Sequence, residues 1–109
     1  MRALDISAIK FDASGLVPVV AQDSVTKDVL MLAYATKETL EESQKIGKLV
    51  FFSRSRNQRW LKGETSGNYL ILDSLSSDCD GDTVLAMVSP VGPACHNGTT
   101  NCFLEPADD

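Results

Sequence analysis

Long apolar stretches are missing from this sequence. No run approaches the roughly 20 residues that a membrane-spanning helix needs. The first five residues, Met-Arg-Ala-Leu-Asp, are interrupted by charge where a signal peptide requires a continuous apolar segment. We therefore expect a cytoplasmic protein without a membrane partner.

Basic residues are also scarce. Ten Lys and Arg residues stand against fifteen Asp and Glu residues, which gives a formal net charge of -5. Proteins that bind nucleic acid usually carry a basic surface that replaces phosphate counterions. The charge balance therefore argues against nucleic acid as a partner, and we expect any recognition of phosphate to be local.

Cysteine and histidine are few, with three Cys and one His among 109 residues. Three thiols cannot all pair within one chain, and in a reducing compartment they are more often metal ligands, reactive groups or core residues than disulfides. Hydrophobic residues make up 43% of the chain, as in ordinary soluble domains. The length suits one core, so we predict a single domain over residues 1–109 with a frayed acidic tail at 105–109.

Apolar segments of strand length recur along the chain. The strand candidates are residues 16–21, 29–34, 48–53, 69–72 and 83–88. The first two are expected to form a hairpin buried on both faces, and Pro18 suggests an edge position or an irregular start.

One helix is predicted between the second and third strand candidates. Thr36 can cap its N-terminus, and Gly47 is a natural left-handed stop. Only Leu40 and Ile46 are strongly apolar within it, so the helix is expected on the surface. The pattern as a whole predicts a β-rich α+β domain.

The three cysteines, Cys79, Cys95 and Cys102, lack the paired C-x2-C spacing of common structural zinc sites. Three thiolates nevertheless suit zinc, and they leave one tetrahedral position open for a water whose pKa zinc lowers to about 7. Spacing alone leaves burial as small hydrophobes equally open. A closed site completed by His96 is disfavoured because neighbouring side chains diverge in extended backbone, and His96 would then be free to carry protons.

An aspartate triplet, Asp78, Asp80 and Asp82, occupies alternate positions around Cys79 and Gly81. In an extended backbone the three carboxylates would share one face and Cys79 the other. Clustered carboxylates repel one another unless a cation neutralises them, and oxygen ligands suit magnesium or calcium. The alternative is an acidic turn facing solvent.

A basic, glycine-flanked segment follows the third strand candidate and stands out in an acidic protein. Arginine forks and a lysine can hold phosphate, and hydroxyls and backbone amides of a glycine-rich loop can add donors. The alternative is a solvated edge strand that ends in a polar turn. The candidate substrate-binding residues are Ser53, Arg54, Arg56, Trp60, Lys62, Gly63, Thr65, Ser66 and Gly67.

These segments, in this order, resemble the phosphoribosyl-AMP cyclohydrolase family across nearly the whole chain. The resemblance is carried by residues 52–56 (FSRSR), Trp60, residues 62–67 (KGETSG), residues 78–82 (DCDGD), and residues 92–96 (GPACH) with 102–103 (CF). It implies hydrolytic opening of the adenine ring of phosphoribosyl-AMP at the N1–C6 bond, in the third step of histidine biosynthesis.

The resemblance also implies metals, assembly and fold. Cys79, Cys95 and Cys102 would bind zinc, with cysteines of two subunits meeting at one ion, and Asp78, Asp80 and Asp82 would bind magnesium. The expected architecture is a mostly antiparallel or mixed, half-barrel-like folded sheet in an intertwined homodimer. Some relatives carry a fused pyrophosphohydrolase domain after the Cys-Phe pair, and only six residues follow Phe103 here, so we expect that activity to be absent from this chain.

For the chemistry we consider His96 the candidate proton carrier and Glu64 a second acid or base. Asn68 stands where some family members have histidine, which argues against a proton-transfer role at that position. A zinc deaminase is a rival, but its H-x-E and P-C-x-x-C signature is missing. A zinc-stabilised nucleotide-binding or sensor protein without turnover is the rival from another class.

Overall fold

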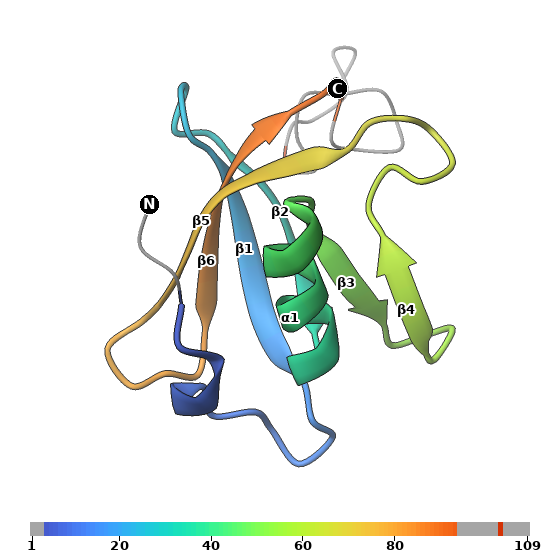
Figure 1. The fold of residues 1–109 in the computed structure, drawn as a ribbon. Coiled ribbons are helices and arrows are strands. Elements are labelled where there is room, and N and C mark those ends of the chain that lie inside the picture. Colours follow the sequence, from blue (N-terminus) through green and yellow to red (C-terminus); the bar gives the residue numbers. More distant parts are fainter. Residues whose placement is uncertain (1–3, 94–102, 104–109) are drawn as a thin grey trace.

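The computed structural model describes residues 4–93 and residue 103 (Figure 1). The fold is α+β and rich in strands, as predicted. Its elements are η1 (Ile6–Ala8), β1 (Val17–Asp23), β2 (Val29–Ala35), α1 (Lys37–Ile46), β3 (Val50–Ser53), β4 (Gln58–Leu61), β5 (Leu70–Ser77) and β6 (Val84–Pro90). No helix in this part of the chain is long and apolar enough to cross a bilayer.

The strands form a larger and a smaller sheet. The larger one is mixed and open, in the order β2-β1-β6-β5, with β1 and β6 parallel and the other pairs antiparallel. The smaller sheet is the β3–β4 hairpin, which lies beside α1 in Figure 1. An isolated bridge between Lys48 and Ile71 connects the start of β3 to β5. The sheet is thus mixed and folded, as expected, and whether two copies intertwine stays a prediction.

The core lies along the two inner strands of the larger sheet. Every second residue of β1 is buried, and β6 alternates in the same way. This alternation is what a sheet with one covered face requires. Phe51 of β3 and Leu40 of α1 complete the core from the other layer.

The expectation that the first hairpin is buried on both faces is wrong, since only every second residue of β1 is buried and β2 is more exposed still. Val29 and Leu32 remain 42% and 49% exposed, because β2 is an edge strand with one open face. Pro18 does not mark an edge, since β1 is an inner strand. It is the second residue of β1 and precedes Val19, where pairing with β6 begins. The alternative of an irregular start is not observed either, because Val17 and Pro18 pair in register with β2 and the register shift lies between Ala21 and Gln22.

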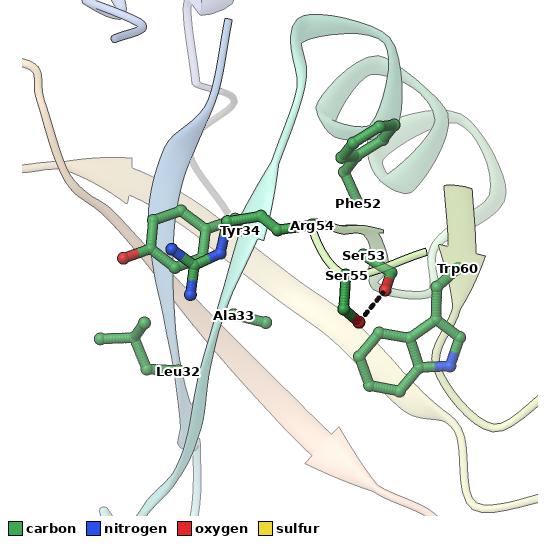
Figure 2. A pocket seen from close by; sticks show the side chains of 8 residues that line it. All are labelled: Leu32, Ala33, Tyr34, Phe52, Ser53, Arg54, Ser55 and Trp60. Atoms are coloured by element: carbon green, nitrogen blue, oxygen red, sulfur yellow. Dashed lines mark hydrogen bonds between the residues drawn. The ribbon is translucent and has the colours of Figure 1, made fainter. Parts of the chain in front are cut away.

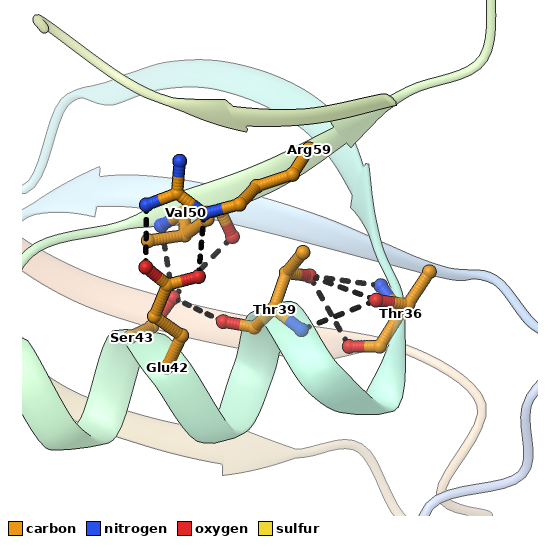
Figure 3. A network of polar contacts seen from close by, with 6 residues as sticks. All are labelled: Thr36, Thr39, Glu42, Ser43, Val50 and Arg59. Atoms are coloured by element: carbon orange, nitrogen blue, oxygen red, sulfur yellow. Dashed lines mark hydrogen bonds and ion pairs between the residues drawn. The ribbon is translucent and has the colours of Figure 1, made fainter. Parts of the chain in front are cut away.

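The helix begins and ends where the sequence predicts. The Thr36 hydroxyl accepts a hydrogen bond from the Thr39 amide (3.1 Å), and Gly47 adopts a left-handed conformation with φ of 75°. Thr39, Leu40 and Ser43 form a buried stripe, while Ile46 stays exposed on the surface. The buried Ser43 hydroxyl donates to the Thr39 carbonyl and accepts from the Val50 amide, both at 2.8 Å, which joins α1 to β3 (Figure 3).

Candidate functional site

The β3–β4 hairpin carries the basic segment. Ser53 ends β3, residues 54–57 form the turn, and Trp60 in β4 pairs with Phe51 of β3. The two rings lie 5.6 Å apart between centroids and are tilted by 43°. Phe51 is fully buried and anchors Trp60, whose indole stays partly exposed. An exposed indole face next to arginines can stack on a planar ligand.

An open hollow of about 590 Å³ lies between this hairpin and β2 (Figure 2). The guanidinium carbon of Arg54 is 3.8 Å from the ring centroid of Tyr34. A cation at this distance is attracted by the ring, so Tyr34 holds Arg54 against the wall of the hollow. The lining residues are Leu32, Ala33, Tyr34, Phe52, Ser53, Arg54, Ser55 and Trp60.

A second hollow, of about 340 Å³, has a more polar lining. It shares Ser53, Ser55 and Trp60 with the first hollow, so these three side chains border both. The hydroxyl oxygens of the two serines lie 3.4 Å apart, within hydrogen-bond distance. The full lining is Ser53, Ser55, Arg56, Gln58, Arg59, Trp60, Glu64 and Thr65.

The arginines of the hairpin differ in their partners. Arg59 forms a bidentate ion pair with Glu42 of α1, with Nε donating to Oε1 at 2.6 Å (Figure 3). This hydrogen bond lowers the pKa of Glu42 and raises that of Arg59. Within residues 4–93 neither Arg54 nor Arg56 pairs with a carboxylate. Their charges are therefore available to a ligand, whereas that of Arg59 is neutralised.

Lys62, a predicted phosphate ligand, is largely buried at 8% exposure. Its side chain makes no hydrogen bond or ion pair with the described residues, and it lines neither hollow. The structure thus separates Lys62 from the two arginines with which the sequence grouped it.

The loop after β4 has a fixed backbone. Gly63 has φ of 93°, and a Cβ there would lie 2.5 Å from the Tyr69 nitrogen, so glycine is required. The Gly67 amide donates to the Gly63 carbonyl at 2.7 Å, and the Ser66 hydroxyl accepts from the amide of Asn68. Glu64 and Thr65 of this loop reach the second hollow, whereas Gly63, Ser66 and Gly67 line neither.

The aspartate triplet lies in the turn between β5 and β6. One carboxylate oxygen from each of Asp78, Asp80 and Asp82 lies within 4.8 Å of the others, so the three could hold a metal ion. The predicted convergence is present, but the predicted extended backbone is wrong. Residues 79 and 80 form a turn, Gly81 has φ of 79°, and the Asp78 carboxylate accepts from the amides of Asp82 (3.1 Å) and Thr83 (3.3 Å).

Hydrogen bonds inside the triplet shift the pKa values of Asp78 and Asp82 in opposite directions. Burial tends to raise the pKa of Asp78, but hydrogen bonds with the side chains of Asp82 and Asp80 and with backbone amides outweigh it and lower the pKa. The pKa of Asp82 is raised, first by its hydrogen bonds with Asp80 and Asp78. Carboxylates in such contact share a proton unless a cation replaces it. All three are exposed and line an obvious position for a hard cation.

The family model described as Phosphoribosyl-AMP cyclohydrolase matches residues 31–104, which span the two hollows and the aspartate turn. The chain belongs to the phosphoribosyl-AMP cyclohydrolase family. This is a family of enzymes, and the resemblance seen in the sequence is confirmed.

Similarity to curated proteins supports the same family membership. The chain is 53% identical over 100 residues to the Histidine biosynthesis bifunctional protein HisIE of Thermus thermophilus, covering 92% of this chain and 47% of that protein. It is 48% identical over 93 residues to the protein of the same name from Escherichia coli K12, covering 85% of this chain and 46% of that one. The chain therefore spans about half the length of the curated relatives it matches.

Several predicted cyclohydrolase residues fall outside the described part of the chain. These are Cys95, His96 and Cys102, together with the tail at 105–109, so their predicted roles stay predictions. Cys79 is described, and its thiol is exposed. For Cys79, at least, the alternative of a buried hydrophobe is wrong.

Several lining residues were not predicted from the sequence, among them Tyr34 and Gln58. Gln58 belongs to β4, which is the solvated edge strand ending in a polar turn that the sequence offered only as the alternative for this segment. Tyr34 sits in β2, distant in sequence from the basic segment, and it meets Arg54 only because β2 packs beside β3. No spacing in the sequence signals that contact.

Proposed function

We propose that the chain hydrolyses the N1–C6 bond of the adenine ring of 1-(5-phosphoribosyl)-AMP. The product is the ring-opened phosphoribosylformimino-AICAR phosphate, in the third step of histidine biosynthesis, which we place in the cytoplasm. The observation that carries this proposal is the family match over residues 31–104. Two arginines that pair with no carboxylate among residues 4–93, beside a partly exposed indole, support it, because they suit a phosphorylated nucleotide.

Two metals are part of the proposal. Asp78, Asp80 and Asp82 fit magnesium, since three carboxylates converge within 4.8 Å and hard cations prefer oxygen. Cys79, Cys95 and Cys102 are the proposed zinc ligands, and the exposed thiol of Cys79 is accessible to such an ion. Zinc, when bound, supplies hydroxide at neutral pH by lowering the pKa of water.

The chain's own residues then bind the substrate and move protons. Arg54 and Arg56 hold phosphate, and Trp60 stacks on the purine. Oxygen from water adds at C6, the C6–N1 bond breaks, and N1 receives a proton. His96 is the proposed carrier of that proton, with Glu64 at the edge of the second hollow as a second acid or base.

A homodimer is proposed because strand β6 stands between Cys79 and the segment that leads to Cys95. Cys79 precedes β6 and Pro93 follows it, so the whole strand lies between the two residues. Seven strand residues extend over roughly 20 Å, and the two residues from Pro93 to Cys95 add a reach of at most about 7 Å. Zinc–sulfur bonds are only about 2.3 Å long, so Cys79 would meet Cys95 of a second copy.

The direct test is turnover by the purified chain. Phosphoribosyl-AMP is added, and the absorbance change on ring opening is followed before and after chelation and after return of zinc and magnesium. We expect turnover that is lost on chelation and restored by the two metals together. Binding of the nucleotide without any absorbance change would instead support the sensor reading.

A further inference from the structure

We propose that the two phosphate groups of the substrate bind in separate hollows, one beside Arg54 and the other beside Arg56, with the purine between them against Trp60. This inference rests on the proposed function and assigns the parts of its site. The first hollow contains Arg54 and the second contains Arg56, and neither contains the other's arginine.

Charge supports this division. Each hollow contributes one arginine that has no carboxylate partner among the described residues, in a chain whose formal net charge is -5. A guanidinium without a carboxylate partner favours a dianionic ligand group, because it can donate two parallel N–H···O hydrogen bonds to it. Arg59 also borders the second hollow, but Glu42 occupies its fork.

Geometry supports it as well. Arg54 extends toward the Tyr34 ring and away from Trp60 (Figure 2), and it does not line the second hollow. Trp60, Ser53 and Ser55 border both hollows. A ligand with one phosphate in each hollow would therefore pass over these three side chains. Phosphoribosyl-AMP has the matching shape, because its two ribosyl phosphates are attached on different sides of one planar base.

The experiment uses Arg54→Gln and Arg56→Gln in the full chain with both metals present. The matched control is Lys45→Gln, which removes one charge from the exposed end of α1, outside both hollows. For each protein one measures KM for phosphoribosyl-AMP and the inhibition constant of AMP, which has only one phosphate. Thermal unfolding checks that the exposed substitutions leave the fold intact.

We expect KM to rise about tenfold or more in each arginine variant, as for loss of a charged bidentate contact, and to stay unchanged in the control. The inhibition constant of AMP should rise in one arginine variant only. An equal rise for AMP in both variants, or an unchanged KM in either, overturns the proposal. If the wild type shows no turnover, the proposed function fails, and calorimetric binding of the same two nucleotides still decides between one and two phosphate sites.

Discussion

The guanidinium of Arg54 lies over the ring of Tyr34, with 3.8 Å between the guanidinium carbon and the ring centroid. Tyr34 belongs to β2 and Arg54 to the turn after β3, so this contact joins two walls of the first hollow. It also gives a long, exposed side chain a defined position before any ligand arrives. Such preorganisation reduces the entropy lost when a phosphate is bound.

Tyr34→Leu should therefore weaken substrate binding without stopping the chemistry. We expect KM to rise by roughly two- to tenfold, the size of a partly exposed cation–π contact, with kcat little changed. Tyr34→Phe keeps the ring and should keep KM close to that of the wild type. A loss of kcat with unchanged KM in the leucine variant would show that Tyr34 does not act through Arg54.

Gly63 should be the less replaceable of two glycines in the same loop. Both Gly63 and Gly67 have positive φ, at 93° and 81°, but only at Gly63 does a Cβ meet backbone, 2.5 Å from the Tyr69 nitrogen. Gly63→Ala is expected to cost about 2–4 kcal/mol in the free energy of unfolding, and Gly67→Ala about 1 kcal/mol. Urea unfolding measures both, and equal losses would contradict the close approach at Gly63.

Asp80 gives a clean test of the cation site. Asp78 also holds the turn through two backbone amides, whereas Asp80 accepts no backbone bond among the described residues, so its removal leaves the turn intact. Asp80→Asn should lower magnesium affinity by roughly tenfold or more, because ligand charge sets affinity at such sites. Asp28→Asn, in an exposed turn elsewhere, is the control. Calorimetric titration showing equal affinity in both variants would remove the triplet as the site.

The Glu42–Arg59 pair should contribute modestly and with a defined pH dependence. The pKa of Glu42 is lowered in the folded chain by its hydrogen bond with Arg59. Its contribution is therefore complete above the ordinary value of 4.5 and is lost as the pH falls through the lowered folded value. Glu42→Gln should cost at most about 1 kcal/mol at neutral pH, since both side chains are partly exposed. A difference from the wild type that persists unchanged into strong acid would contradict this assignment.

Shared zinc ligands predict complementation between inactive variants. Cys79→Ser and Cys95→Ser should each lose zinc and turnover. A refolded equal mixture should regain about one quarter of wild-type activity, because half of the dimers are mixed and each of those contains one intact site. Zinc content should recover in parallel. No recovery in the mixture would mean that each site draws its cysteines from one chain.

The helix and the apolar strands could be predicted from the sequence, because caps and apolar runs are local signals. Thr36 and Gly47 set the ends of α1, and the apolar runs found five of the six strands. Strand β4 was expected only as the alternative of a solvated edge strand, because Gln58 and Arg59 are polar and only pairing with β3 makes a strand there. Neither the parallel pairing of β1 with β6 nor the edge position of β2 leaves a local signal.

In the candidate site, too, the sequence predicted the residue types but not their arrangement. The basic segment and the aspartates were visible as composition, but their geometry depends on turns. Gly81 bends residues 78–82 so that the carboxylates converge without an extended strand. Lys62 was predicted to hold phosphate, but it is buried in the fold. Arg59 of the same segment is paired with Glu42. Tertiary contacts therefore decide which charges a ligand can use.

The most direct test of the central claim is the mass of the product formed from phosphoribosyl-AMP by the purified, metal-loaded chain. The account predicts a gain equal to one water molecule, with the new oxygen bound to C6 when the reaction is run in oxygen-18 water. Exchange of the amino group for oxygen would reveal a deaminase, and an unchanged nucleotide would reveal a binding protein. Either of these two results would contradict the account.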